Sequence, residues 1–557
     1  MKKLFFALAS LWLILPLAAQ AAGGVASSAD PRASEAGREI LRAGGTAADA
    51  QMAMMLVLTV VEPQSSGIGG GGFFVYHDGR TGKTETVDGR EMAPAATTPT
   101  RFLDADGKPL PFIQAFPGGL SVGVPGNIAL MAQVHAKWGK LPWARLFDPA
   151  IRLAENGYQV TPLLASRLNQ IKKIWVDFPQ AQAIYWQDGR PKAVGETIKN
   201  PALAALLRSV AKRGAKAFYA GDNARAISSA TAASARNKAV ITARDIARYR
   251  AKDRPAVCAR YRAYRLCGMG PPSSGATTVF QILGLIERFD MKAMGKDDPK
   301  GWHAIAEAMM LAYADREKYL GDADFVQVPV AGLLDKTYIA SRSALISLDK
   351  SLPAYAAGDP PGAARRTAAI SGEVAGTTHF VAVDGAGNVA SMTSTIEGPF
   401  GSQLIANGYF LNNELTDFTL APEKDGALVA NRPQPGKRPL SSMSPTIVYG
   451  PDGKVILALG SAGGKRIIMH VAKTLIGVLD FGLSAKDAIA LPNIYFGGEA
   501  ILVEAGTSLD AMRGALAALG RTVVASDLGS KVNAVERTPT GWRGEADPRS
   551  EGVALEE

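Results

Sequence analysis

Two alternating segments joined by a glycine-rich turn place the strongest constraint on the fold of this 557-residue chain. Residues 378–384 and 388–396 alternate in the manner of half-buried strands, and the Asp-Gly-Ala-Gly-Asn sequence at 384–388 is typical of a turn. The sequence therefore predicts a β-hairpin. Its second strand brings Thr395 back beside Thr377.

Gly376 directly precedes Thr377 at the head of this hairpin. A chain cut between the two would begin with Thr377, whose hydroxyl is a nucleophile and whose new α-amine, titrating near pH ~8, can accept the hydroxyl proton. The glycine leaves its carbonyl open to attack by that hydroxyl. A Thr-Thr pair also begins ordinary strands through β propensity alone, so the motif needs support from the rest of the chain.

Apolar residues at three- and four-residue spacing predict helices at 34–43, 47–61, 127–138, 143–156, 202–213 and 303–319. A segment rich in Ala, Gly and Pro, 349–376, is the best linker candidate and ends at the proposed cut. After Thr377 the chain is rich in predicted strands, with helices at 464–481 and 509–519. This order of elements favours sheets covered by helices.

Motifs on both sides of the linker carry a resemblance to a known family. Those downstream are 393–397 (TSTIE), 412–418 (NNELTDF), 437–445 (KRPLSSMSP) and 460–464 (GSAGG). Those upstream are 62–73 (EPQSSGIGGGGF), 90–94 (REMAP), 124–126 (VPG) and 271–275 (PPSSG). In order and spacing the set resembles the γ-glutamyltranspeptidases, N-terminal nucleophile hydrolases that mature by cutting themselves before a Thr. The resemblance runs from about Gly24 nearly to the C-terminus.

The resemblance implies an α/β fold, the αββα four-layer sandwich of these hydrolases, built by two subunits from one precursor. A cut before Thr377 gives a large subunit, residues 22–376, and a small catalytic subunit, residues 377–557, which stay together as a heterodimer. It also implies that Thr377 is the nucleophile and that Thr395 orients its hydroxyl. The backbone N–H groups of Gly463 and Gly464 then stabilise the oxyanion, although a glycine pair also serves as a plain tight turn.

An α-amino acid head group needs a bidentate cation and hydroxyl donors for its carboxylate, and carboxylates for its ammonium. Arg90, Ser441 and Ser442 match the family positions that hold the γ-glutamyl α-carboxylate. Glu414 and Asp417 match those that hold the ammonium. Each residue alone would more often be a surface charge or a turn hydroxyl, and only the joint pattern points to a binding site.

Three departures from the familiar members stand out. Glu397 occupies a position where they have Asn, and Thr416 one where they have an acidic residue. The loop 418–437 is shorter and lacks an aromatic residue that could act as a lid. Glu397 would add a third carboxylate near the substrate ammonium, and the missing lid should open the side where an acceptor amine enters.

The first residues indicate export. Lys2 and Lys3 precede an apolar run over 4–17 and an Ala-Gln-Ala cleavage site at 19–21, which predicts a signal peptide, residues 1–21. A membrane anchor is the weaker alternative, because the run is shorter than the ~20 residues a bilayer span needs and no second run follows. The mature chain is therefore expected in a periplasm or outside the cell, without a membrane span.

The two cysteines, Cys258 and Cys267, flank a turn between two short predicted strands. In an oxidising compartment they can pair across that hairpin, and two buried free thiols are nearly as well supported. The formal net charge of +10 invites a nucleic-acid interpretation. Lys and Arg are scattered and no nucleic-acid motif is present, so we expect no nucleic-acid partner.

The pattern as a whole predicts a self-processing γ-glutamyl hydrolase and transferase that cleaves glutathione and related γ-glutamyl amides through a γ-glutamyl-Thr ester. Water, amino acids or peptides take the acyl group, and no metal or organic cofactor is expected. One alternative is a cephalosporin or glutaryl-amide acylase on the same scaffold, whose substrate lacks the α-amine. Another is a secreted, nonprocessing amino-acid-binding protein, which the combination of Gly376, Thr377 and Thr395 disfavours.

We expect the purified protein to separate into two fragments that begin near Ala22 and at Thr377, because the Gly-Thr junction ends a predicted linker. N-terminal sequencing of the smaller fragment checks the cut. Thr377→Ala removes the hydroxyl and should leave one uncut, inactive chain, whereas Thr377→Ser keeps a hydroxyl and should still process. A cut and active alanine variant would contradict the proposed nucleophile.

Overall fold

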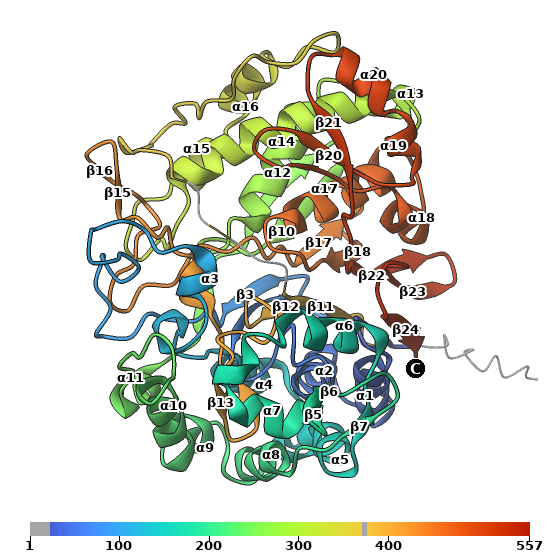
Figure 1. Ribbon diagram of the computed structural model, residues 1–557. Coiled ribbons are helices and arrows are strands. Elements are labelled where there is room, and N and C mark those ends of the chain that lie inside the picture. Colours follow the sequence, from blue (N-terminus) through green and yellow to red (C-terminus); the bar gives the residue numbers. More distant parts are fainter. Residues whose placement is uncertain (1–22, 370–371, 373–375) are drawn as a thin grey trace, which may run out of the picture.

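The computed structural model describes residues 23–369, 372 and 376–557 (Figure 1). The predicted signal peptide, residues 1–21, lies outside the described residues. Within the described ranges, none of the helices has both the length and the apolar character needed to cross a membrane.

Seven antiparallel strands form the first sheet, and their order interleaves the two halves of the chain. The order is β24 (Val553–Glu556), β1 (Val25–Ser28), β11 (Thr378–Val383), β12 (Val389–Thr395), β2 (Gly71–His77), β3 (Thr84–Asp88) and β8 (Lys252–Arg254). The predicted hairpin, β11 and β12, lies between β1 and β2, which precede Gly376 in the sequence. A cut after Gly376 would leave the two pieces hydrogen-bonded to each other inside one sheet.

The second sheet has six antiparallel strands and is also shared by the two halves. Its order is β23 (Gly541–Ala546), β22 (Asn533–Thr538), β18 (Val455–Gly460), β17 (Thr446–Tyr449), β10 (Tyr264–Gly268) and β9 (Val257–Tyr261). Cys258 and Cys267 face each other in the register of β9 and β10, and a disulfide joins them. Of the two alternatives, a disulfide and two free thiols, the structure has the disulfide.

Helices cover the outer face of each sheet, so the protein has four layers (Figure 1). Next to the first sheet are α1 (Pro31–Arg42), α2 (Ala47–Val61), α4 (Asn127–Trp138), α5 (Asp148–Asn156) and α8 (Pro201–Arg213). Next to the second are α12 (Gly275–Ile286), α14 (Pro299–Tyr319) and α17 (Arg466–Leu479). The expected αββα arrangement is confirmed.

The alternation of β11 decides which core each side chain joins. Phe380 and Ala382 pack with the helices of the first outer layer, whereas Val381 and Val383 pack into the core that includes the second sheet. Successive residues of a strand point to opposite faces. All four side chains are fully buried, so the strand is apolar on both faces and the hairpin is held between layers.

Polar contacts join the hairpin to α2, a mostly apolar helix whose residues are all buried. Gln51 of α2 donates from Nε2 to Phe380 O at 2.9 Å and to Ala390 O at 2.7 Å, bridging both strands. Asp384 accepts from Ala386 N and Asn388 N within the turn, each at 3.0 Å, and from Ala47 N at the start of α2. The turn and the helix therefore fix each other's position.

The predicted helices are present, with differences at their ends that have local causes. The predicted 143–156 helix is a 3-10 turn, Trp143–Phe147, followed by α5, and the predicted 509–519 helix is divided into α19 (Ser508–Ala511) and α20 (Arg513–Ala518). The helix predicted from residue 464 begins at Arg466, because Gly463 and Gly464 have positive φ angles. Within the described part of the predicted linker, 349–369 and 372, there is no helix or strand.

The glycine-rich stretch before β2 lets two backbones approach at the end of β12. A Cβ on Gly70 would lie 1.9 Å from Thr395 O, which is a steric clash, so only glycine fits at this position. This part of the glycine-rich run therefore packs directly against the hairpin.

Candidate active site

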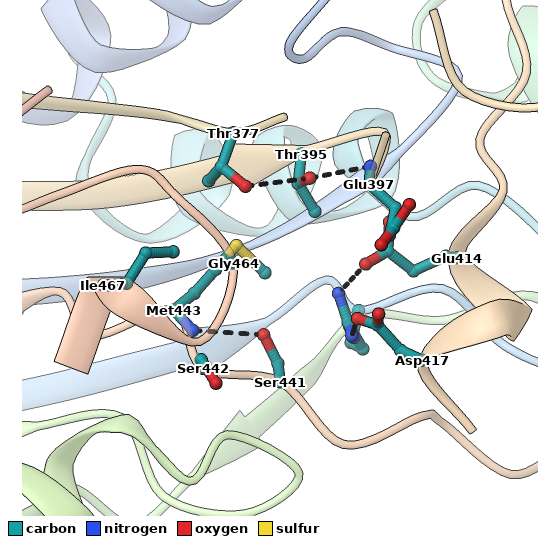
Figure 2. A pocket seen from close by; sticks show the side chains of 11 residues that line it. Thr377, Thr395, Glu397, Glu414, Asp417, Ser441, Ser442, Met443, Gly464 and Ile467 are labelled. Atoms are coloured by element: carbon teal, nitrogen blue, oxygen red, sulfur yellow. Dashed lines mark hydrogen bonds and ion pairs between the residues drawn. The ribbon is translucent and has the colours of Figure 1, made fainter. Parts of the chain in front are cut away.

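Two threonine hydroxyls meet where β11 begins and β12 ends. The register pairs Thr378 with Ser394, which sets Thr377 beside Thr395. Thr377 donates from Oγ1 to Thr395 Oγ1 at 3.2 Å, and Thr395 Oγ1 also accepts from Glu397 N at 2.7 Å (Figure 2). The predicted orienting contact is therefore present, and both side chains are buried.

The backbone before Thr377 passes against the loop that follows β12. A Cβ on Gly376 would lie 2.1 Å from Glu397 O. Glu397, Phe400 and Gln403 in that loop have φ angles of +75°, +62° and +70°, a region that non-glycine residues adopt at a cost of about 1–2 kcal/mol each. Such strain gathers at functional sites, where surrounding contacts enforce it.

A pocket of about 220 Å³ opens beside the two threonines. It is lined by residues that the sequence singled out, together with two apolar ones that it missed: Arg90, Thr377, Thr395, Glu397, Glu414, Asp417, Ser441, Ser442, Met443, Gly464 and Ile467. Carboxylates gather at one end of the pocket, and the serines lie below the threonines (Figure 2). Gly463 lies outside this pocket and lines a neighbouring cavity.

Arg90 is the second residue after β3 and is almost fully buried. Its Nη1 pairs with Glu414, its Nη2 contacts Asp417 Oδ2 at 2.5 Å and Leu440 O at 2.8 Å, and its Nε donates to Pro439 O at 3.1 Å. Glu414 and Asp417 open and close one 3-10 turn, whose i and i+3 side chains lie on the same side. The sequence predicted these acids for a substrate ammonium, and the structure pairs both with Arg90.

Carboxyl groups outnumber the single guanidinium at this end of the pocket, because Glu414 and Asp417 pair with Arg90 and Glu91 lies 3.9 Å from it. Burial raises the pKa of Glu91 to about 7 despite the opposing charge of Arg90. Burial also raises the pKa of Glu414 well above its ordinary value, and Glu91 and Glu397 add to that rise. For Arg90, burial alone would lower the pKa, but the charges of Glu414 and Asp417 outweigh it and raise the pKa. A cationic ligand beside these carboxyl groups would favour their ionised forms.

Glu397 is held by Asn413. Its Oε2 accepts from Asn413 Nδ2 at 2.5 Å, and the same amide donates to Thr416 Oγ1 at 3.1 Å. Asn413 Oδ1 accepts from Gly398 N at 2.9 Å. Two departures from the family pattern, Glu397 and Thr416, thus bind one asparagine.

The two serines are positioned by residues from the segment before Gly376. Ser441 N donates to Pro272 O at 3.0 Å, and Ser274 N donates to Ser441 O at 2.7 Å. Ser442 Oγ accepts from Arg316 Nη2 at 2.8 Å, and Arg316 Nε donates to Ser274 Oγ at 2.8 Å. Arg316 was missed in the sequence, where its only signal is a charge on the apolar repeat of the 303–319 helix.

Gly463 and Gly464 form the turn between β18 and α17, with φ angles of +132° and +60°. Among the described residues, no hydrogen bond is found from the N–H group of either glycine, so both can donate to a ligand. His470 of α17 lies beneath the turn, with Nδ1 3.0 Å from Ser461 Oγ and 3.2 Å from Ala462 O. Burial lowers the pKa of His470 and keeps it neutral.

The described part of the chain has no group of three or more His, Cys, Asp or Glu side chains arranged to hold a metal ion. The chemistry that the site offers is that of a buried hydroxyl, two free backbone donors and a pocket that accepts cations and hydrogen-bond donors.

Comparisons with known proteins agree with this geometry. A sequence model of the family described as Gamma-glutamyltranspeptidase matches residues 33–556. The chain is 37% identical to the glutathione hydrolase proenzyme of Bacillus subtilis (strain 168) over 85% of this chain and 80% of that protein. It is 36% identical to the glutathione hydrolase proenzyme of Escherichia coli (strain K12) over 95% and 90%. The crystal structure of cephalosporin acylase from Bacillus halodurans superposes with a TM-score of 0.85 and 28% identity, covering 96% of each chain.

Gly376→Ala should slow or stop the predicted cleavage. A Cβ there would collide with the Glu397 carbonyl oxygen and move the carbonyl of residue 376 away from the Thr377 hydroxyl. Gly372→Ala is the matched control, since its Cβ would meet no atom nearer than 3.9 Å. Electrophoresis of both variants over time after expression measures processing. If Gly376→Ala were cut as fast as the control, the close approach at Glu397 would have no role in cleavage.

Proposed function

This chain is an enzyme of the γ-glutamyltranspeptidase family, and we propose that it cuts its own Gly376–Thr377 bond and then acts on γ-glutamyl amides such as glutathione. The γ-glutamyl group passes to Thr377 and then to water, an amino acid or a peptide. One observation carries the proposal: the Thr377 hydroxyl, which donates to Thr395, borders a pocket lined by Arg90 and by the carboxyl groups of Glu397, Glu414 and Asp417.

In the self-cleavage step, Thr377 Oγ1 attacks the Gly376 carbonyl carbon. The C–N bond breaks, the hydroxyl proton ends on the Thr377 nitrogen, and Gly376 becomes an ester of Thr377 Oγ1. Water then hydrolyses the ester, returning the proton to Oγ1 and leaving a carboxylate on Gly376. The two products, residues 22–376 and 377–557, would remain associated because both sheets contain strands of each.

Turnover repeats this chemistry with a substrate amide. The free α-amine of Thr377 accepts the hydroxyl proton as Oγ1 attacks the γ-carbonyl, and the proton passes to the leaving amine when the C–N bond breaks. The N–H groups of Gly463 and Gly464 are the donors available to the oxyanion. Removal of one such donor costs about 2.7–4 kcal/mol of transition-state stabilisation in other enzymes. Water or an acceptor amine then attacks the γ-glutamyl ester and restores the hydroxyl.

The charge balance of the pocket supports an α-amino acid head group. An ammonium beside Glu414 and Asp417 supplies the cation that the cluster lacks. Those two acids form ion pairs with Arg90 in this structure. An α-carboxylate can therefore reach the guanidinium only if one of these ion pairs breaks. Ammonium binding favours that exchange, because it offers the displaced acid a new partner.

The acylase alternative draws support from the likeness to the cephalosporin acylase. A glutaryl group carries the distal carboxylate but no ammonium, so it would leave the carboxylates of the cluster without added compensation. Unpaired buried charges are costly, and this disfavours glutaryl substrates. The binding-protein alternative is abandoned, since the chain belongs to an enzyme family. The proposed periplasmic or secreted location rests on residues 1–21.

Arg90→Lys should raise KM for a γ-glutamyl anilide about tenfold to hundredfold, because the point charge of Lys cannot replace the fork that meets two acids and two carbonyls. A charge-assisted hydrogen bond is worth about 1.5–3 kcal/mol. Steady-state kinetics measures the change, and thermal unfolding shows whether the variant is folded. Arg80→Lys, an exposed control, should leave KM unchanged. An unchanged KM in Arg90→Lys would remove this residue from the site.

The wild type should favour a γ-glutamyl anilide over the glutaryl anilide by a factor on the order of a hundred in kcat/KM, because the second substrate lacks the ammonium. Glu397→Gln should narrow this ratio by improving the glutaryl reaction. A glutamine at this position can still accept from Asn413, so the loop should hold. Glu423→Gln, on the exposed hairpin strand β15 (Glu423–Lys424), is the control.

The outcomes of this comparison separate two questions. Equal or faster cleavage of the glutaryl anilide by the wild type would replace the γ-glutamyl assignment with the acylase one. A normal wild-type ratio that Glu397→Gln does not move would keep the assignment, and Glu397 would then act only through its bond to Asn413.

A further inference from the structure

The turn between β18 and α17 holds two N–H groups, those of Gly463 and Gly464, that make no hydrogen bond within the described ranges. Gly464 lines the Arg90 pocket together with Thr377, and Gly463 lines the neighbouring cavity, which Thr377 also borders. Under the proposed function these N–H groups donate to the oxyanion, and such donors act best when their directions are fixed in advance. The contacts that fix these directions therefore bear on the rate.

Each of the two N–H groups belongs to a peptide unit whose carbonyl is already bound. Both peptide bonds are trans, so the N–H and the C=O of each unit lie in one plane and point in opposite directions. Holding the carbonyl oxygen therefore aims the N–H group. Gly464 N shares its peptide unit with Gly463 O, which accepts from Arg466 N at 3.3 Å. Gly463 N shares its unit with Ala462 O, whose partners are side chains.

His470 and Ser461 hold the Ala462 carbonyl. Nδ1 of His470 lies 3.2 Å from Ala462 O and 3.0 Å from Ser461 Oγ, and Ser461 Oγ donates to Ala462 O at 3.2 Å. Because burial lowers its pKa, His470 is neutral and has one ring proton, on Nδ1 or on Nε2. A carbonyl oxygen only accepts, so the bond to Ala462 O requires the proton on Nδ1.

The imidazole ring is also in place to support the turn by contact. A Cβ on Gly463 would lie 3.1 Å from His470 Cε1, so the ring edge packs directly against this glycine. His470 itself is buried on α17, where every residue from 467 to 477 is buried. The ring is therefore held by a packed helix, and its Nδ1–H has a fixed position relative to the turn.

We propose that His470 is a positioning residue: its Nδ1–H holds the Ala462 carbonyl and thereby aims the Gly463 N–H group at the oxyanion. The inference rests on the proposed function for the reaction, although Thr377 would form an oxyanion from a γ-glutamyl or a glutaryl amide alike. Hydrogen bonds to the carbonyl also polarise the peptide unit and strengthen its N–H as a donor. Loss of Nδ1–H should therefore weaken binding of the transition state and spare binding of the substrate.

Two variants separate the hydrogen bond from the bulk of the ring. His470→Leu removes the donor, whereas His470→Asn keeps an N–H donor in the place of Nδ1. His470→Leu should lower kcat about tenfold or more with KM unchanged, which is part of the roughly hundredfold to thousandfold that a whole oxyanion donor supplies. His470→Asn should retain most of the wild-type kcat. Rates are taken per mole of processed chain, which electrophoresis measures.

His303→Leu is the matched control. His303 is also buried on a helix, α14, and its Nε2 lies 3.1 Å from a loop carbonyl, Ser347 O. Thermal unfolding shows what each leucine variant loses in stability, and the control should keep the wild-type kcat. Should His470→Leu fail to fold or to process, His470→Gln takes its place, because its amide reaches the position of Nε2 and not that of Nδ1. A wild-type kcat in the donor-less variant, or a loss confined to KM, would overturn the proposed role.

Binding of a transition-state analogue tests the same role without turnover. In the boronic acid analogue of glutamate, boron replaces the γ-carbonyl carbon. The boron accepts an electron pair from Thr377 Oγ1 and becomes a tetrahedral anion, while the hydroxyl proton passes to the Thr377 amine. Its dissociation constant should rise in His470→Leu by about the factor by which kcat/KM falls, and should stay at the wild-type value in His303→Leu.

The glutaryl anilide and the boronic acid without the α-amine are measured in parallel. A protein that cleaves and binds only these two compounds would lose its γ-glutamyl assignment, and the comparison of His470→Leu with the wild type would still decide the role of His470. Equal affinity of the two proteins for the boronic acid that binds, or binding of neither boronic acid, would overturn that role.

Discussion

The antiparallel register of β11 and β12 determines where the two threonine hydroxyls of the site lie. It pairs Thr378 with Ser394, so that Thr377 and Thr395 become neighbours at the open end of the hairpin. A slip of β12 by one residue would turn the Thr395 hydroxyl to the face opposite Thr377. Gln51 bridges the two strands from α2, and Asp384 closes the turn while binding the start of that helix. Contacts at the turn of the hairpin and along α2 therefore hold the register, and this register places Thr377 beside Thr395 at the open end.

The buried charge around Arg90 cannot be explained by stability alone. Buried ion pairs lose most of their attraction to desolvation, and apolar residues of similar volume are often equally or more stabilising. Removing one partner is nevertheless costly, about 3–5 kcal/mol, because the other charge is then left unpaired. Here three carboxyl groups lie around one guanidinium, and burial raises the pKa of two of them, Glu91 and Glu414. A site that awaits a cationic ligand accounts for this arrangement better than a structural role does.

Local patterns in the sequence predicted the hairpin and the helices, whereas the resemblance to the γ-glutamyltranspeptidases implied the four layers and most of the pocket. The alternation of apolar residues over 378–396, the turn residues at 384–388 and the helical spacing of apolar residues are all visible in short stretches of sequence. The pairing of Arg90 with Glu414 and Asp417 was not predictable, because no local pattern reports a contact across 324 residues. The role of Arg316 was hidden for the same reason, since its contacts to Ser274 and Ser442 depend on how α14 packs.

The departures at positions 397 and 416 are linked, because both side chains contact Asn413. In the family pattern inferred from the sequence, an amide stands at 397 and an acid at 416. Here the acid is at 397, the hydroxyl of Thr416 is at the other position, and Asn413 Nδ2 donates to both side chains. The negative charge has therefore moved across Asn413 without changing the number of carboxylates. Glu397 N also donates to Thr395 Oγ1, which accepts from Thr377 Oγ1, so the residue that carries this charge is one hydrogen bond away from the two threonine hydroxyls. Under the proposed function, this arrangement would couple head-group recognition to the nucleophile.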